Sequence, residues 1–333
     1  MLKFANIARS NLLRQMPQRS FASVATSNKI KLVEVGPRDG LQNEKQVIPS
    51  EVKIELINKL SNVGLTSIEA TSFVSPKWVP QMADARQVLT SITQKPDISY
   101  PVLAPNVKGL EAAIEAGAKE VAVFSAASET FNKKNTNCTM EESMNRVEAI
   151  MEVARKNNVK IRGYVSCVVG CPYEGPVSPQ VVADMSKRLL DMGCYEISLG
   201  DTIGVGTPGS ISNMLEAVLK VAPVDKLAVH THDTYGQALA NILCSLDYGI
   251  RTFDSSIAGL GGCPYAPGAK GNVATEDVVY MLHGSGYDTG INLDELIHIG
   301  DWISQKLGRS TGSRAGSALL LAEQRQQQLK AKL

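Results

Sequence analysis

The run His230-Thr231-His232 ends an apolar stretch and brings two imidazoles within two residues of each other. In an extended strand, side chains at positions i and i+2 point to the same side, so both rings enter the same space. The chain holds only 4 histidines, and two of them meet here. A single buried histidine is more often a hydrogen-bonded core residue, but a pair on one face beside Asp233 favours a metal site.

Two more residues offer oxygen ligands near predicted strand ends. Asp39 lies in the tight turn Gly36–Gly40, directly after an apolar run, and Asn272 lies in the glycine-rich segment 268–272. An ordinary turn and an ordinary loop asparagine are the respective alternatives. Together, an Asp, two His and an Asn provide nitrogen and oxygen ligands without a thiolate. This set suits Mg2+ or Mn2+, with positions open for substrate oxygens, better than a closed structural zinc site, and zinc is the alternative.

The glycine-rich run 259–265 carries a thiol, Cys263, between Gly262 and Pro264. A thiol with an unperturbed pKa of about 8.5 is mostly protonated at neutral pH and can deliver a proton. We therefore expect Cys263 to be catalytic, with loop packing as the alternative. The other cysteines lie in apolar runs or in loops, and the sequence has no Cys-x-x-Cys pair that would suggest a redox or metal motif: Cys138, Cys167, Cys171, Cys194 and Cys244.

The segment Gly204–Gly209 matches the Gly-x-Gly-x-x-Gly pattern of dinucleotide sites. Such a site also needs an acidic residue about 20 positions later, at the end of the next strand. That strand instead ends in the histidine pair and Asp233. Thr207-Pro208 fits better as a helix N-cap followed by proline in the first turn, so we expect neither a nicotinamide nor a flavin cofactor.

These polar residues stand at the ends of short apolar runs that alternate with helical segments. Strands that alternate with helices of roughly 10–15 residues indicate βαβ units and a parallel sheet. Eight such units in about 250 residues predict an α/β fold closed as a (β/α)8 TIM barrel, whose chemistry sits at the carboxyl ends of the strands. The predicted strands are Lys31–Val35, Ser67–Thr71, Ser99–Ala104, Glu120–Ser125, Lys160–Cys167, Glu196–Thr202, Leu227–Asp233 and Thr252–Ala258.

The two ends of the chain differ from this pattern. The first acidic residue is Glu34, and the Arg- and Ser-rich, acid-free segment 1–27 is typical of a mitochondrial transit peptide, with a frayed N-terminus as the alternative. We expect the barrel to span residues 30–290 and a C-terminal helical extension to span 291–333. The final Ala331-Lys332-Leu333 is related to the peroxisomal Ser-Lys-Leu address, and a Lys-rich helix tail is the alternative.

The overall composition is that of an ordinary globular protein. Hydrophobic residues make up 44% and charged residues 20% of the chain, and the formal net charge is +1. These values exclude a disordered, fibrous or disulfide-dense class, and they give no basic field for nucleic acid. No apolar run approaches the roughly 18 residues that a membrane span needs. We therefore expect neither a nucleic acid nor a membrane partner.

From about residue 30 to residue 310, the chain resembles the 3-hydroxy-3-methylglutaryl-CoA lyase family, in the superfamily of aldolase and condensing-enzyme barrels. The resemblance rests on segments 35–44, 71–82, 230–233 and 258–265, and the cysteine loop in the last is specific because related synthases lack it. The resemblance implies Asp39, His230, His232 and Asn272 as metal ligands, Arg38 as a substrate contact and Cys263 as the catalytic thiol. It also matches Glu69, Asp201 and Glu276 to acidic residues that line the family's site.

The family's reaction is a retro-Claisen cleavage of 3-hydroxy-3-methylglutaryl-CoA to acetoacetate and acetyl-CoA, used in ketone-body formation and leucine degradation. The resemblance implies that Arg38 holds the enolate oxygen and that Cys263 protonates the departing carbon. The base stays open among Asp39, His230 and a metal-linked water. The family further implies a homodimer in the mitochondrial matrix, with a peroxisomal signal in some members.

Three alternatives to the lyase are open. A condensing synthase shares the barrel and the metal set but has no need of Cys263. A metal-dependent amidohydrolase would carry its His-x-His on the first strand, whereas His230 and His232 lie on the predicted seventh strand. A catalytically silent barrel would show gaps in the set of site residues, and the sequence shows none.

Overall fold

The computed structural model describes residues 28–262 and 271–331. The predicted transit peptide 1–27, the thiol Cys263 and the last two residues of the chain therefore lie outside the described residues. The described part contains a nine-stranded sheet of parallel pairs, in the order β2-β1-β11-β10-β9-β6-β5-β4-β3. Its strands are β1 (Lys31–Glu34), β2 (Ser67–Ile68), β3 (Thr71–Ser72), β4 (Val102–Leu103), β5 (Glu120–Ala126), β6 (Lys160–Ser166), β9 (Glu196–Asp201), β10 (Leu227–Thr231) and β11 (Thr252–Ser255).

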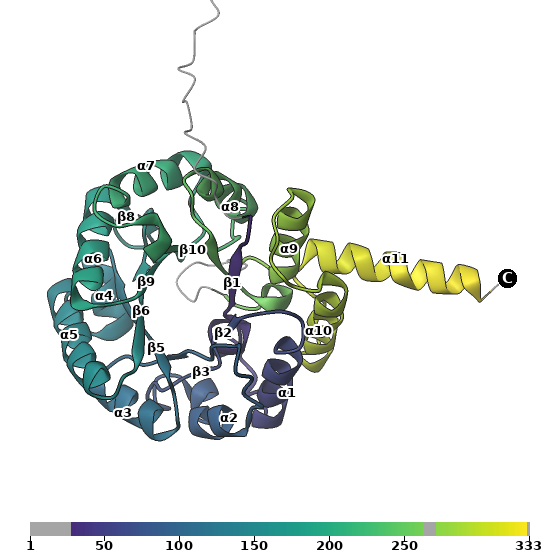
Figure 1. Ribbon diagram of the computed structural model, residues 1–333, viewed down its shortest axis with the longest axis horizontal. Coiled ribbons are helices and arrows are strands. Elements are labelled where there is room, and N and C mark those ends of the chain that lie inside the picture. The colour runs from purple at the N-terminus through teal and green to yellow at the C-terminus, as the bar shows by residue number, and fades with distance from the viewer. Residues whose placement is uncertain (1–27, 263–270, 332–333) are drawn as a thin grey trace, which may run out of the picture.

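The two ends of this sheet belong to one interrupted strand. β2 pairs with β1, and β3, which begins three residues after β2 ends, pairs with β4. Between them, the amide of Glu69 donates to the carbonyl of Glu34 on β1, and the amide of Ala70 donates to the carbonyl of Pro101 beside β4. The strands therefore close into a ring, which Figure 1 shows surrounded by helices. The predicted (β/α)8 barrel is confirmed.

The helices of the barrel repeat cover the outside of the ring and bury the apolar side chains that face it. In α5, the residues at positions 144, 147, 150, 151 and 154 are buried, which is the i, i+3, i+4 spacing of a helix face that packs on a sheet. Thr139 caps this helix, and the side chain of Glu142 reaches back to the amide of Thr139. The helices are α1 (Ser50–Leu60), α2 (Ala85–Ser91), α3 (Val107–Glu115), α4 (Glu129–Thr136), α5 (Met140–Lys156), α6 (Pro179–Met192), α7 (Pro208–Val218), α8 (Ala238–Asp247), α9 (Thr275–Gly284), α10 (Leu293–Lys306) and α11 (Arg314–Lys330).

Besides the break of the predicted strand Ser67–Thr71 into β2 and β3, two further short elements depart from the sequence prediction. An antiparallel hairpin of β7 (Gly170–Cys171) and β8 (Gly175–Pro176) follows β6, and two-residue strands with Gly and Pro leave no hydrophobic alternation to detect. The predicted strand 252–258 stops at Ser255, because the chain turns there into η4 (Ile257–Gly259), where Ala258 adopts a left-handed φ of 54°.

The C-terminal helices lie outside the barrel repeat. α10 packs against α1, α9 and η4, and α11 extends away from the ring toward the C-terminus (Figure 1). The Asp277 carboxylate of α9 fixes the start of α11, since it accepts from the Ser313 hydroxyl at 2.7 Å and from the Ala315 amide at 2.7 Å. No helix in the described ranges is long and apolar enough to cross a membrane.

Buried Glu34 joins the turn after β1 to the turn after β11. Its carboxylate accepts from the amides of Gly36 and Ile257, each at 2.8 Å, and from the Thr275 hydroxyl at 2.6 Å. A Cβ at Gly36 would lie 2.6 Å from the Glu34 carboxylate, so this close approach requires glycine. The turn η1 (Gly36–Gly40), which carries Arg38 and Asp39, is thereby held against η4, where Glu34 binds the amide of Ile257, six residues before Cys263 in the sequence.

Candidate functional site

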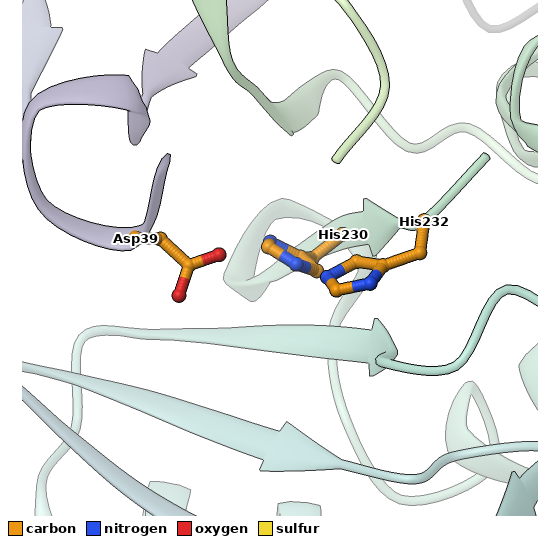
Figure 2. Close-up of side chains that lie close together, drawn as sticks. All are labelled: Asp39, His230 and His232. Carbon is orange, nitrogen blue, oxygen red and sulfur yellow. The ribbon is translucent and has the colours of Figure 1, made fainter. Parts of the chain in front are cut away.

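The structure brings Asp39, His230 and His232 together at the carboxyl ends of β1 and β10. One ligand atom from each residue lies within 4.8 Å of the others. His230 lies on β10 and His232 directly follows this strand, and the Asp39 carboxylate points toward both imidazoles from η1 (Figure 2). The histidine rings are 5.2 Å apart between centroids, so the i and i+2 positions of the strand do present both rings to one space.

Asn272 completes this group from the segment after β11. It pairs with His232 in an isolated antiparallel bridge, and its amide nitrogen donates to Asp39 Oδ2 at 2.8 Å. Its Oδ1 atom and the Nδ1 atom of His232 are buried and have no hydrogen-bond partner among the described residues. A carboxylate, two imidazoles and an unpaired amide oxygen suit a divalent cation with nitrogen and oxygen ligands, so the residues present fit such a metal.

Electrostatics keep Asp39 in its ionised form. Burial alone would raise the pKa of Asp39, but the Arg38 guanidinium and the two histidines lower it below its usual value. The closest cation contact is Arg38 Nη1, which lies 2.6 Å from Asp39 Oδ1. At His232, burial favours the neutral imidazole. Burial and the neighbouring His230 together lower the pKa of His232 to about 3. A neutral imidazole beside an ionised carboxylate is the protonation state that metal ligation requires.

Arg38 is buried between two carboxylates. Its Nη2 donates to Glu69 Oε2 at 2.8 Å, in addition to the contact with Asp39. Burial by itself would lower the pKa of Arg38, but Glu69 and Asp39 raise it, so the guanidinium stays charged. Its Nε atom is buried and has no hydrogen-bond partner among the described residues. Arg38 therefore carries a donor that remains for a substrate.

Glu69, Asp201 and Glu276, the acidic residues that the resemblance matches to the family's site, are not among the residues that line the cavity above the Asp39, His230 and His232 group. Glu69 orients Arg38, and burial raises the pKa of Glu69. Asp201 accepts from the amides of Gly206 at 2.8 Å and Val205 at 3.2 Å, so it holds the loop after β9.

Glu276, the third of these residues, accepts from the amide of Ala258 at 2.9 and 3.0 Å, and burial raises its pKa to about 8. Glu276 therefore binds the start of the segment that leads to Cys263.

A cavity of about 890 Å³ opens over this group. Arg38, Asp39, His230 and His232 lie on its wall, and so does Gly262, the chain neighbour of Cys263. The Cys263 side chain itself lies outside the described residues. Besides Arg38, three other cationic residues among those described line this cavity: Lys45, Lys134 and Arg146.

Sequence reasoning missed a set of buried charges inside the barrel. Arg162 on β6 and Asp254 on β11 form an ion pair at 2.8 Å, with side chains that are 1% and 0% exposed. The Tyr164 hydroxyl accepts from Arg162 at 2.8 Å and lies 3.3 Å from Glu69. The available signal was a charged residue inside each of two apolar strand runs, where charges are rare unless they are paired.

A sequence profile described as HMGL-like matches residues 29–303 of this chain. The chain is 61% identical over 300 residues to mitochondrial hydroxymethylglutaryl-CoA lyase of Bos taurus, a match that covers 90% of this chain and 92% of that protein. It is also 60% identical over 289 residues to cytoplasmic 3-hydroxy-3-methylglutaryl-CoA lyase of Rattus norvegicus, covering 87% of this chain and 84% of that one.

Solved structures agree with these sequence matches. The hydroxymethylglutaryl-CoA lyase of Pseudomonas aeruginosa is 56% identical and superposes with a TM-score of 0.87, covering 89% of this chain and 99% of that chain. The carboxyl transferase domain of Rhizobium etli pyruvate carboxylase is only 18% identical, with a TM-score of 0.66 over 84% of this chain and 48% of that chain, and shares the fold alone.

Proposed function

This chain belongs to the HMGL-like family, and we propose on that premise that it is a lyase that cleaves 3-hydroxy-3-methylglutaryl-CoA to acetoacetate and acetyl-CoA. The observation that carries the proposal is the cluster of Asp39, His230 and His232 beside a buried Arg38, in a cavity of a chain that is about 60% identical to named lyases. The reaction is a retro-Claisen cleavage, in which a tertiary hydroxyl becomes a ketone as the adjacent carbon–carbon bond breaks.

The HMGL-like lyases are metal-dependent. In this chain Asp39, His230, His232 and Asn272 would hold the ion, which we propose to be Mg2+ or Mn2+. A bound divalent ion supplies Lewis acidity to substrate oxygens and so acidifies the tertiary hydroxyl. The hydroxyl proton must leave for the carbon–carbon bond to break. Asp39 and His230 are the candidate bases that would take it.

Arg38 supplies the charge that the departing acetyl-CoA fragment needs. Electrons of the broken bond move into the thioester carbonyl and leave an enolate oxygen, which a fixed guanidinium stabilises. Glu69 and Asp39 already hold two of the Arg38 nitrogens, so the guanidinium is oriented before substrate binds, and its Nε remains as a donor. Such preorganisation avoids the cost of reorienting the donor during the reaction.

We propose Cys263 as the acid that protonates the enolate carbon and so yields the methyl group of acetyl-CoA. Its chain neighbour Gly262 lies on the wall of the cavity that also holds Arg38. Buried Glu34 and Glu276 bind the amides of Ile257 and Ala258, at the start of the segment that leads to this thiol. These contacts fix the start of the segment near the cavity, which supports the proposed catalytic role of Cys263.

The proposal extends to the assembly and location of the protein. Relatives of high identity are named mitochondrial, so we propose the mitochondrial matrix, with residues 1–27 as the transit peptide. We further propose a homodimer, a barrel over residues 30–290 and an extension over 291–333, whose terminal Ala331-Lys332-Leu333 also directs the protein to peroxisomes.

The direct test is coupled detection of acetoacetate from 3-hydroxy-3-methylglutaryl-CoA, with the protein lacking residues 1–27 and with or without Mg2+ or Mn2+. Activity that depends on the ion and nearly disappears in Cys263→Ala and in His232→Ala supports both parts of the site. No product from folded, metal-loaded protein would contradict the proposal, and condensation of acetyl-CoA with 2-oxo acids would be tested next.

A further inference from the structure

A buried ionic cluster lies inside the barrel, next to the metal ligands and separate from them. Asp254 on β11 is its centre: Oδ1 accepts from Arg162 Nη2 at 2.8 Å, and Oδ2 accepts from Arg162 Nη1 at 3.2 Å and from the Ser198 hydroxyl at 2.6 Å. Arg162 also donates through Nε to Glu196 at 2.7 Å. Asp254 does not itself line the described cavity, so it acts on the site only through a neighbour.

That neighbour is His230. Asp254 and His230 are register partners on the adjacent parallel strands β11 and β10, so their side chains lie next to each other on the inner face of the barrel. His230 Nδ1 lies 3.3 Å from Asp254 Oδ2. This separation is slightly long for a hydrogen bond, and His230 Nδ1 is a buried atom with no hydrogen-bond partner among the described residues. A small rotation of the ring about its Cβ–Cγ bond aligns it with Asp254 without moving the strand.

We propose that Asp254 is a positioning residue that keeps the proton of the His230 imidazole on Nδ1 and thereby leaves Nε2 for the metal. A ring in this state has no free lone pair, so of the two candidate bases Asp39, and not His230, would take the hydroxyl proton. The proposal rests on the metal site of the proposed function. Neutral histidine carries its proton on one nitrogen only, and a carboxylate next to Nδ1 favours the tautomer that donates to it. Metal-bound histidines commonly use a carboxylate in this way, which fixes the ring orientation and raises the basicity of the ligating nitrogen.

The cluster around Asp254 is built to keep it fixed and charged. Arg162 Nη2 pairs with Asp254 Oδ1 at 2.8 Å in the interior of the barrel, and an adjacent guanidinium favours the ionised carboxylate. The two guanidinium contacts and the Ser198 hydroxyl hold both carboxylate oxygens in place, so the carboxylate cannot turn away from His230. A fixed acceptor of this kind costs the protein no reorganisation when the metal binds.

An Asp254→Asn substitution separates this role from simple packing, because the amide has nearly the same shape. Arg162 can only donate, so the amide oxygen of the variant turns toward Arg162 and the amide NH2 group faces His230. An NH2 group next to Nδ1 favours the opposite tautomer, with the proton on Nε2, which then cannot ligate without losing it. Glu196→Gln is the matched control, because it also neutralises a carboxylate partner of Arg162 but Glu196 is not a partner of His230.

The tautomer is measured by long-range 1H–15N NMR on protein with 15N-labelled imidazoles, and the His230 signals are assigned with a His230→Gln variant. The chain has 4 histidines, so the spectrum is simple. Mn2+ affinity is measured in parallel from the EPR signal of the free ion. We expect Nδ1–H in the wild type, Nε2–H in Asp254→Asn with Mn2+ bound about 10- to 100-fold more weakly, and in Glu196→Gln the wild-type tautomer and an affinity within about threefold.

Three results would overturn the proposal: Nε2–H at His230 in the wild type, unchanged Mn2+ affinity in Asp254→Asn, or an equal loss of affinity in Glu196→Gln. If circular dichroism shows that Asp254→Asn is unfolded, the tautomer of His230 in the wild type still tests the proposal. If the wild type binds no Mn2+ and forms no acetoacetate, the proposed function is contradicted instead. The comparison of the His230 tautomer between wild type and Asp254→Asn still tests the role of Asp254.

Discussion

The Arg38 guanidinium donates to the Glu69 carboxylate at 2.8 Å, although the two residues are 31 positions apart in the sequence. They meet because β1 and β2 are parallel neighbours, so the turn after one strand lies beside the end of the other. Removing one partner from a buried pair leaves the other charge uncompensated, which is costly. The direction of the guanidinium is thus set jointly by Glu69, after the second strand of the barrel, and by Asp39 in its own turn.

Arg38→Lys should lower kcat for cleavage by about 10²- to 10³-fold, because a lysine ammonium cannot hold Glu69 and Asp39 and still present a third, fixed donor. The measurement is steady-state acetoacetate formation at saturating metal. Arg86→Lys is the matched control, since Arg86 also forms an ion pair at 2.7 Å, with Glu115, but on the exposed surface. Equal kcat values for Arg38→Lys and the wild type would contradict the role of Arg38.

Two buried carboxyl groups, Glu276 and Glu34, should make stability fall as the pH rises. Burial raises the pKa of Glu276 to about 8 and that of Glu34 to about 7, well above the ordinary glutamate value of 4.5. Between about pH 4.5 and these pKa values the folded chain binds more protons than the unfolded chain, so the free energy of unfolding decreases with pH across that window. Below the window both states are protonated, and above it the full penalty is present.

Glu276→Gln should therefore flatten this slope and make the protein more stable than the wild type above pH 8, by about 3–5 kcal/mol at most. The amide oxygen can still accept from Ala258, and Glu34 should keep a smaller slope below about pH 7. Urea denaturation from pH 5 to pH 9 measures the free energy of unfolding of both proteins. A slope as steep in the variant as in the wild type would show that Glu276 is ionised in the folded state.

Local patterns in the sequence were sufficient to predict the barrel and the places of its strands. Alternating apolar runs and helical spacing reflect the burial of each unit, and the polar residues Asp39, His230 and His232 stand at strand ends where the fold gathers them. The contact between Arg162 and Asp254 spans 92 positions and forms only when the ring closes, so no local period signals it. The break of the second strand between Ile68 and Thr71 also depends on its two different neighbours.

Bound Mn2+ should stabilise the protein through Asp39 and its partners. At a free concentration of about 100 times the dissociation constant, one site contributes about 2.7 kcal/mol, which raises Tm by a few degrees for a chain of this size. Asp39→Asn should abolish most of this shift, and chelation with EDTA should remove it from the wild type. Differential scanning calorimetry measures both. A metal shift that survives in Asp39→Asn would place the ion elsewhere in the protein.

Cys263→Ala should lower kcat for acetoacetate formation by about 10²- to 10⁴-fold, the range that a positioned proton donor supplies. The loss should appear without any change in the Mn2+ shift of Tm, because Cys263 is not among the proposed ligands. Cys244→Ala is the control for loss of a thiol, since Cys244 lies on α8, where it contacts Ser212 at 3.2 Å.

Incorporation of solvent deuterium into the product distinguishes a proton donor from a packing residue at position 263. In D2O, the wild type should place deuterium in the methyl group of acetyl-CoA with a solvent isotope effect on kcat. Cys263→Ser, which nearly preserves the shape but raises the pKa of the donor, should remain as slow as Cys263→Ala. A serine variant with wild-type kcat would mean that the loop needs only a small side chain there, and a condensing synthase, which needs no thiol at this position, would then regain support.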